Sequence, residues 1–153
     1  MPKIVLDAIA QTDRTGYPAP FDAAVKGRFY RRLAPATGLT DFGVSHVTLA
    51  PGAWSSQRHW HVGEDEFLVV VSGEAVLVDD DGDTVLRPGD CAAFPKNDGN
   101  GHHLQNRSEA PCVFVVVGGG TLLGGTYSDI DMRFTAEGGY EHKDGTPYNA
   151  RRA

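Results

Sequence analysis

The chain has 153 residues, enough for one domain with a sizeable hydrophobic core. Its 14 Lys and Arg against 20 Asp and Glu give a net charge of −6, which excludes the basic surface that nucleic-acid binding requires. The N-terminus lacks the pattern of a signal peptide, and no apolar run approaches the roughly 18 residues of a transmembrane helix, so we expect no signal peptide and a cytoplasmic protein without nucleic-acid or membrane partners.

Residues 1–41 form the first segment and have no regular pattern. Prolines at positions 2, 18, 20 and 35 interrupt it, and it contains no helix-turn-helix pattern of the kind that a DNA-binding regulator carries. We expect this segment to be an irregular N-terminal arm. It should pack on the rest of the chain or on a partner subunit.

Residues 42–125 alternate short β-branched and apolar segments with glycine and proline turns. This spacing is typical of an all-β sandwich or barrel, and no helical period interrupts it. We therefore predict an all-β barrel core with little helix. The expected strands are 43–50, 67–73, 74–80, 83–89, 91–95, 103–106 and 112–118.

Residues 126–153 contain one more strand candidate at 129–135, followed by a polar C-terminal tail. The tail either folds across the mouth of the barrel or stays in solvent. Charged tails more often stay in solvent.

Two histidines, His59 and His61, stand two residues apart just before the apolar segment 67–73. In a strand such residues point to the same face, so their imidazoles converge. Glu66 begins the next strand, where a buried carboxylate is costly unless it is paired or coordinated. A later strand offers either His102 or His103, which as neighbours face opposite ways. These residue types favour a metal site over isolated strand histidines with local hydrogen bonds.

The spacing of these residues resembles the two conserved motifs of the cupin superfamily. The first motif is carried by Gly52, His59, His61, Glu66 and Gly73, and the second by Gly89, Pro95, Gly99, His102 and Asn106. The chain departs from the usual pattern by one extra residue before His59 and by two extra residues between Pro95 and Gly99. The resemblance covers roughly residues 50–118.

This resemblance implies a double-stranded β-helix, the jelly-roll cupin barrel, preceded by the N-terminal arm. It also implies one divalent metal ion inside the barrel, held by His59, His61, Glu66 and His102, with His103 outside the ligand set. Such ligands suit Zn, Mn, Fe, Ni or Co, and they leave coordination positions open, as catalytic sites do.

Two classes of function follow from the resemblance. The first is a metal-dependent enzyme that acts on a small polar substrate by isomerisation or dioxygenation. The second is a non-catalytic module that binds or senses a small ligand. A sugar phosphate would require cationic contacts to its phosphate, for which Arg58, Lys96 and Lys143 are candidates, although Arg58 should face away from the ion.

Gln57 and Phe114 are the candidate substrate-binding residues. Gln57 is expected on the face of the two histidines, and Phe114 lies in the predicted strand 112–118. A role in the core is the alternative for each side chain.

We predict a homodimer, because an arm of about 40 residues can cover a sheet edge whose unpaired backbone groups otherwise promote aggregation. Light scattering at micromolar protein concentration should give the mass of two chains. A mass of one chain under these conditions would contradict the prediction.

Overall fold

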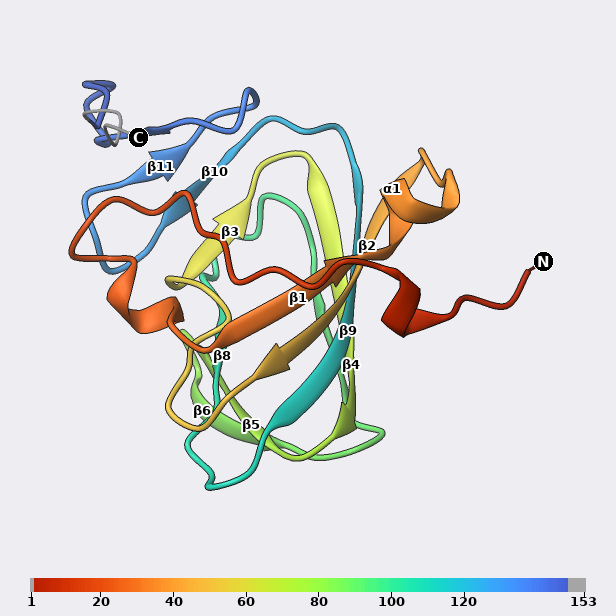
Figure 1. The fold of residues 1–153 in the computed structure, drawn as a ribbon. Helices are drawn as coiled ribbons and strands as arrows, with labels where there is room; N and C mark the ends of the chain where they lie inside the picture. The colour runs from red at the N-terminus through yellow and green to blue at the C-terminus, as the bar shows by residue number, and fades with distance from the viewer. Residues whose placement is uncertain (1, 149–153) are drawn as a thin grey trace.

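The fold was obtained as a computed structural model, which describes residues 2–148. These residues form an almost all-β barrel, which confirms the predicted fold class (Figure 1). The strands are β1 (Arg28–Arg32), β2 (Phe42–Leu49), β3 (His59–His61), β4 (Glu64–Ser72), β5 (Ala75–Asp79), β6 (Gly82–Leu86), β7 (Cys91–Phe94), β8 (His103–Gln105), β9 (Cys112–Gly120), β10 (Gly125–Tyr127), β11 (Arg133–Phe134) and β12 (Tyr140–Glu141). The helices are the 3-10 turns Leu6–Ala8 and Ala23–Val25 and the short α1 (Leu33–Thr37).

The barrel has one large wall and two smaller sheets. The large wall has the strand order β1-β2-β9-β4-β7, and the smaller sheets have the orders β6-β5-β8 and β12-β11-β10-β3. All of the paired strands are antiparallel. An isolated bridge between His59 and His102 joins β3 to the segment that precedes β8. This bridge brings two distant parts of the chain together at the barrel interior.

The core lies between these sheets and follows from the alternation of side chains along the strands. On β4, Leu68 and Val70 point inward, and on β9, Cys112 and Phe114 do the same. Leu104 from β8 closes the cluster from the opposite wall. Glu66 shares the face of Leu68 and Val70, as its spacing predicts, and therefore points into the barrel.

The N-terminal segment contains a strand that the sequence did not reveal. β1 pairs along its whole length with β2, from Arg28 opposite Leu49 to Arg32 opposite Ser45. The expectation of a wholly irregular arm is therefore wrong. β1 has the sequence Arg-Phe-Tyr-Arg-Arg, which is neither an apolar run nor an apolar/polar alternation, and the strand gains its order by pairing with the edge of β2.

The C-terminal segment folds onto the barrel beside β3. β10 pairs with β3, and β11 and β12 extend the same sheet. A second apolar cluster, which includes Tyr17, Tyr127 and Met132, fixes this sheet to the N-terminal segment. Tyr148 packs edge-on against Phe21. The expectation of a solvated tail is thus wrong as far as residue 148, and residues 149–153 lie outside the described part.

Within residues 2–148, no helix has the length and apolar character that are needed to cross a bilayer. The longest α-helix, α1, has only 5 residues.

Asn106 is a buried amide that joins three segments of backbone. Its Nδ2 donates to the carbonyl oxygens of Leu49 at 2.9 Å and Ala110 at 2.8 Å. Its Oδ1 accepts from the backbone N and the hydroxyl of Ser108. The side chain is 1% exposed, so no water can replace these bonds without rearrangement.

We expect Asn106→Ala to lower the free energy of unfolding by about 3 kcal/mol, because it leaves buried backbone groups without partners. Asn100→Ala is the matched control: its amide oxygen accepts one exposed hydrogen bond from Asp80, and its loss should cost about 0.5 kcal/mol. Urea unfolding monitored by circular dichroism measures both values. Equal losses in the two variants would contradict the assigned role.

Candidate metal centre

The hairpin between β3 and β4 places the two histidines beside Glu66. Gly63 makes the turn with φ of +85°, and a Cβ at this position would collide with the carbonyl oxygen of Thr121. Since β3 begins at His59, His59 and His61 share the inward face of the strand. His102 reaches the same point through its backbone bridge to His59.

The three imidazoles and the carboxylate converge on one point. The Nε2 atoms of His59 and His61 are 3.1 Å apart. Glu66 places Oε2 at 3.3 Å from Nε2 of His61 and Oε1 at 3.3 Å from Nε2 of His102. One donor atom from each of the four residues lies within 4.8 Å of all the others. The structure therefore brings together the four residues that the resemblance implies as metal ligands.

This arrangement suits a divalent ion. Neighbouring ligands on one ion are about 3.0–3.4 Å apart, given metal–nitrogen distances near 2.1 Å, and the 3.1 and 3.3 Å separations in the cluster match this spacing. The Nδ1 of His59 lies 2.8 Å from the carbonyl oxygen of Gln57 and donates to it, which leaves a lone pair on Nε2. That lone pair faces the Nε2 of His61 at 3.1 Å, and a cation between the two rings could accept a lone pair from each.

Burial and the neighbouring charges separate the pKa values in the cluster. Burial, and secondly the neighbouring His102, lower the pKa of His59 to about 3, so the His59 ring is neutral at physiological pH. Burial would also lower the pKa of His61, but hydrogen bonds and charge from Glu66 and Glu64 outweigh it and raise that pKa. Burial opposes ionisation of Glu66, yet hydrogen bonds from His102 and His61 hold its pKa well below the ordinary value.

Aromatic rings fix the orientation of the imidazoles. Phe94 stacks on His102 with the ring centroids 3.5 Å apart and an angle of 5° between the planes. Phe134 of β11 meets His59 and His61 edge-on at 5.8 and 5.4 Å. The C-terminal sheet therefore covers one side of the donor cluster, and its apolar ring limits the access of water from that side.

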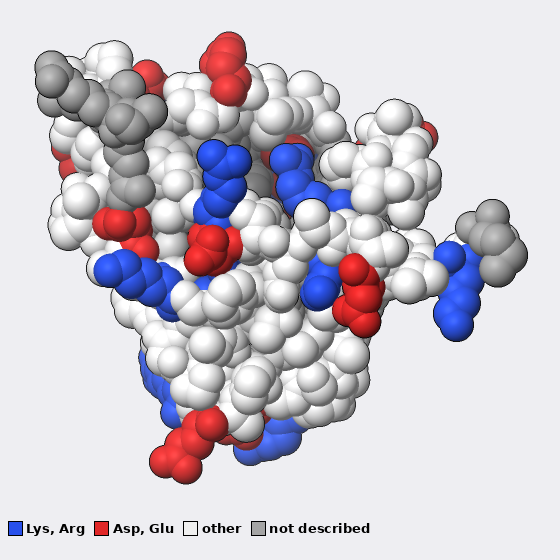
Figure 2. Space-filling view, in the orientation of Figure 1, with Lys and Arg blue, Asp and Glu red and all other residues white. Residues whose placement is uncertain are grey.

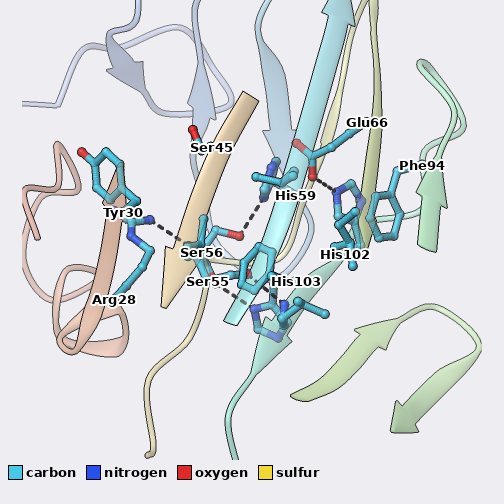
Figure 3. A pocket seen from close by; sticks show the side chains of 15 residues that line it. Arg28, Tyr30, Ser45, Ser55, Ser56, His59, Glu66, Phe94, His102 and His103 are labelled. Carbon is cyan, nitrogen blue, oxygen red and sulfur yellow. Dashed lines mark hydrogen bonds and ion pairs between the residues drawn. The ribbon is translucent and has the colours of Figure 1, made fainter. Parts of the chain in front are cut away.

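A cavity of about 240 Å³ lies on the other side of the cluster. His59, Glu66 and His102 form part of its wall, and Figure 3 shows them at the opposite side from Arg28 and Tyr30 of β1. The apolar part of the wall comes from Val47, Leu68, Phe94, Leu104, Phe114 and Val116. The donor cluster thus borders a half-open cavity that can receive a small molecule.

Of the two predicted substrate-binding residues, only Phe114 lines this cavity. Gln57 is buried, but its Nε2 donates to the carbonyl oxygen of Phe21, and its backbone N donates to the hydroxyl of Tyr17. The prediction for Gln57 assumed that β3 already includes residue 57. Because the strand starts at His59, Gln57 does not share the face of the two histidines.

His103 lies outside the donor cluster, as the resemblance implies, but it is buried and lines the cavity. Its Nδ1 donates to the carbonyl oxygen of Ser56 at 2.8 Å, and its Nε2 accepts from the amide of Gln105 at 3.0 Å. Both ring nitrogens are therefore engaged in a neutral tautomer, and burial lowers the pKa of the ring.

The cation nearest to the histidines in sequence, Arg58, is not available to a ligand. Its guanidinium forms ion pairs with Asp80 and Asp129 outside the cavity, so it faces away from the donor cluster as expected. The cation that lines the cavity is Arg28. Arg28 could not be singled out from the sequence, because its segment matches no motif and lacks a clear strand pattern.

Comparison with known proteins gives the following relatives. A family model described as the cupin domain matches residues 45–118. The crystal structure of a cupin-superfamily sugar phosphate isomerase from Silicibacter pomeroyi DSS-3 is 47% identical, with a TM-score of 0.90, and the match covers 99% of each chain. No curated protein sequence matches this chain.

Two more distant structures share the fold. A protein of Acidithiobacillus ferrooxidans ATCC 23270, described provisionally as a sugar phosphate isomerase, is 25% identical over 82% of this chain and 81% of its own, with a TM-score of 0.70. The polyketide cyclase RemF from Streptomyces resistomycificus is 20% identical over 78% of this chain and 79% of its own, with a TM-score of 0.63. The likeness to the cyclase is one of fold alone.

The metal-free protein should lose stability as the pH falls from 7 to 5. An unfolded histidine has a pKa near 6.5, so the unfolded chain gains a proton at position 59 while the folded chain does not, which favours unfolding by about 2 kcal/mol. His61 contributes in the opposite direction: its raised pKa stabilises the fold below pH 6.5, and this stabilisation is lost as the pH rises through the folded-state pKa.

Urea unfolding of chelator-treated protein at pH 7 and pH 5 measures this effect. His59→Asn should reduce the difference in the free energy of unfolding between pH 7 and pH 5 by about 2 kcal/mol, because the titrating group is gone. The control His142→Asn removes a histidine outside the donor cluster and should leave the difference unchanged. The same pH dependence in wild type and His59→Asn would contradict the buried, neutral state of His59.

Proposed function

The chain belongs to the cupin superfamily, and from this membership we propose that it is a metal-dependent enzyme acting on a small polar substrate. The observation that carries the proposal is that three residues have two roles. His59, Glu66 and His102 belong both to the donor cluster and to the wall of the cavity. An ion held by the cluster would therefore be within reach of a molecule in the cavity.

Isomerisation is the first candidate reaction. It is supported by the 47% identity, over nearly the whole length of both chains, to the sugar phosphate isomerase from Silicibacter pomeroyi. A divalent ion, when bound, supplies a Lewis acid that polarises a carbonyl or hydroxyl oxygen of the substrate. Zn, Mn, Fe, Ni and Co all suit three imidazoles and a carboxylate.

The residues of the chain would hold the metal ligands in position and limit the access of water to the cavity. The stacked Phe94 and the carboxylate of Glu66 hold His102 in place. Leu68, Phe114 and Val116 give the cavity an apolar wall, which strengthens electrostatic interactions with a bound molecule because little water competes for them.

Dioxygenation is the second candidate, and one observation favours it. Moving a proton between carbons requires a base, and the cavity wall offers no base that is free of other contacts. Both nitrogens of His103 are engaged, the hydroxyl of Tyr30 donates to the carbonyl oxygen of Arg14, and Glu66 belongs to the donor cluster. Dioxygenation of a substrate on an oxidisable ion does not require such a base. We also propose that the protein is cytoplasmic and forms a homodimer.

We expect protein purified without added metal or chelator to contain close to one divalent ion per chain, as measured by elemental analysis. The double variant His59→Ala, His61→Ala should lose it, because two of the four donors are removed. His46→Ala is the matched control, since His46 lies in β2 outside the donor cluster and should leave the metal content unchanged.

Two assays on the metal-loaded protein separate the candidate reactions. Exchange of substrate C–H for deuterium in D₂O, followed by NMR with a panel of sugar phosphates, tests isomerisation. Oxygen consumption in the presence of diketones, thiols or phenols tests dioxygenation. Absence of metal in the wild type, even after reconstitution, would overturn the metal-dependent proposal and favour the non-catalytic ligand-binding alternative.

A further inference from the structure

Arg28 lies at the end of the cavity that is furthest from the donor cluster. It comes from β1, the strand that the N-terminal segment adds to the barrel. Figure 3 shows Arg28 and Tyr30 on one side of the cavity and Glu66 with His102 on the other. Figure 2 shows Lys and Arg side chains on both sides of a hollow in this face of the molecule. The cavity therefore joins a group of metal-type donors to a positively charged end.

The charge of Arg28 is not matched by a carboxylate. Its Nη1 donates to the carbonyl oxygen of Ser55 at 2.7 Å, and its Nη2 donates to that of Arg14 at 3.3 Å. None of the ion pairs formed by residues 2–148 includes Arg28. Arg58, in contrast, is held between two carboxylates outside the cavity. Arg28 thus keeps a net positive charge beside the half-open cavity.

The guanidinium also keeps free hydrogen-bond donors. It has five N–H groups, of which the two carbonyl oxygens occupy two. Its Nε is buried and has no partner within the described part of the chain. The face of Tyr30 lies 5.3 Å from the centre of the guanidinium and holds it in a fixed position. A half-buried cation whose buried Nε–H has no acceptor is less favourable than one that an anion reaches.

The hydroxyl of Ser55, whose carbonyl oxygen contacts Arg28, can take part in an anion site, and Ser45 offers a second hydroxyl further along the cavity wall. The hydroxyl oxygen of Ser55 accepts from the backbone N of Leu104 at 2.9 Å, which leaves its proton free to be donated. Ser45 also lines the cavity, and its hydroxyl has no hydrogen bond among residues 2–148. A planar guanidinium with a nearby hydroxyl is an arrangement that binds a carboxylate or a phosphate group.

We propose that the ligand of the cavity carries an oxyanion, a carboxylate or a phosphate ester, and that Arg28 binds this group while the rest of the ligand points to the donor cluster. Arg28 then determines which polar molecules the cavity accepts. The inference rests on the proposed function only in taking the cavity as the site of the substrate. Anion binding by Arg28 itself does not require the metal.

The test measures binding of inorganic phosphate and of acetate to the metal-free protein by isothermal titration calorimetry at constant ionic strength. Arg28→Met keeps the length of the side chain and removes its charge. This substitution should weaken binding of the preferred anion by at least about tenfold, because it removes a charge-assisted hydrogen bond. Arg87→Met is the matched control, because Arg87 is an exposed arginine outside this cavity, and its loss should change the affinity less than about twofold.

A second substitution at position 28, and a repeat of the titrations in a protein without two of the metal donors, test the result further. Arg28→Lys retains the charge without the planar fork and should weaken binding by less than Arg28→Met does. If Arg28→Met does not fold, Arg28→Lys against Arg87→Lys becomes the deciding comparison. Repeating the titrations in the His59→Ala, His61→Ala protein removes the metal donors and excludes binding of phosphate to traces of metal.

The outcomes show which kind of anion binds, and they distinguish a failure of the role of Arg28 from a failure of the proposed function. If Arg28→Met loses affinity for phosphate but not for acetate, the oxyanion of the ligand is a phosphate group. If it loses affinity for acetate but not for phosphate, the oxyanion is a carboxylate. Equal affinities in wild type and Arg28→Met, or equal losses in Arg28→Met and Arg87→Met, would overturn the role of Arg28. If the wild type binds metal but Arg28→Met binds the anion as well as the wild type does, the proposed function stands and the role of Arg28 fails. If the wild type binds no metal but Arg28→Met loses anion affinity, the role of Arg28 stands and the metal-dependent function fails.

Discussion

The burial of one carboxylate, Glu66, is the constraint around which the site is organised. It sits at the inward face of β4, where an unpaired negative charge would be strongly unfavourable. Its two oxygens face different imidazoles, those of His61 and His102, which come from separate parts of the chain. Compensation of this charge therefore requires that the β3–β4 hairpin and the segment before β8 meet at one point. The fold secures that meeting through the backbone bridge between His59 and His102.

Local rules predicted an all-β barrel and the pairing of His59 with His61, and the resemblance to the cupin motifs implied the full set of donors. Strand alternation places His59 with His61, and the motif spacing selects His102 over its neighbour His103. The same rule misplaced Gln57, because alternation applies only within a strand and β3 starts two residues later. Arg28 could not be predicted from the pattern, since its position in the cavity depends on the pairing of β1 with β2.

The two ends of the cavity thus have different origins in the chain. The donor end is built by residues 59–102, which lie within the part that matches the cupin domain, residues 45–118. The cationic end is built by β1, which precedes that part. A change in the N-terminal segment could therefore alter which ligand is accepted without disturbing the donor cluster. This separation is consistent with one fold serving several chemistries.

The size of the cavity limits the ligand further. About 240 Å³ is below the roughly 300–1,000 Å³ that is usual for sites of drug-sized ligands, so only a small molecule can occupy it. Its middle is apolar, while its ends offer donors for a cation on one side and an unmatched guanidinium on the other. A molecule with an oxyanion at one end and a carbonyl or hydroxyl at the other would satisfy both ends at once. It would be held in a single orientation, because reversing it would place the oxyanion beside Glu66 and leave Arg28 without a partner.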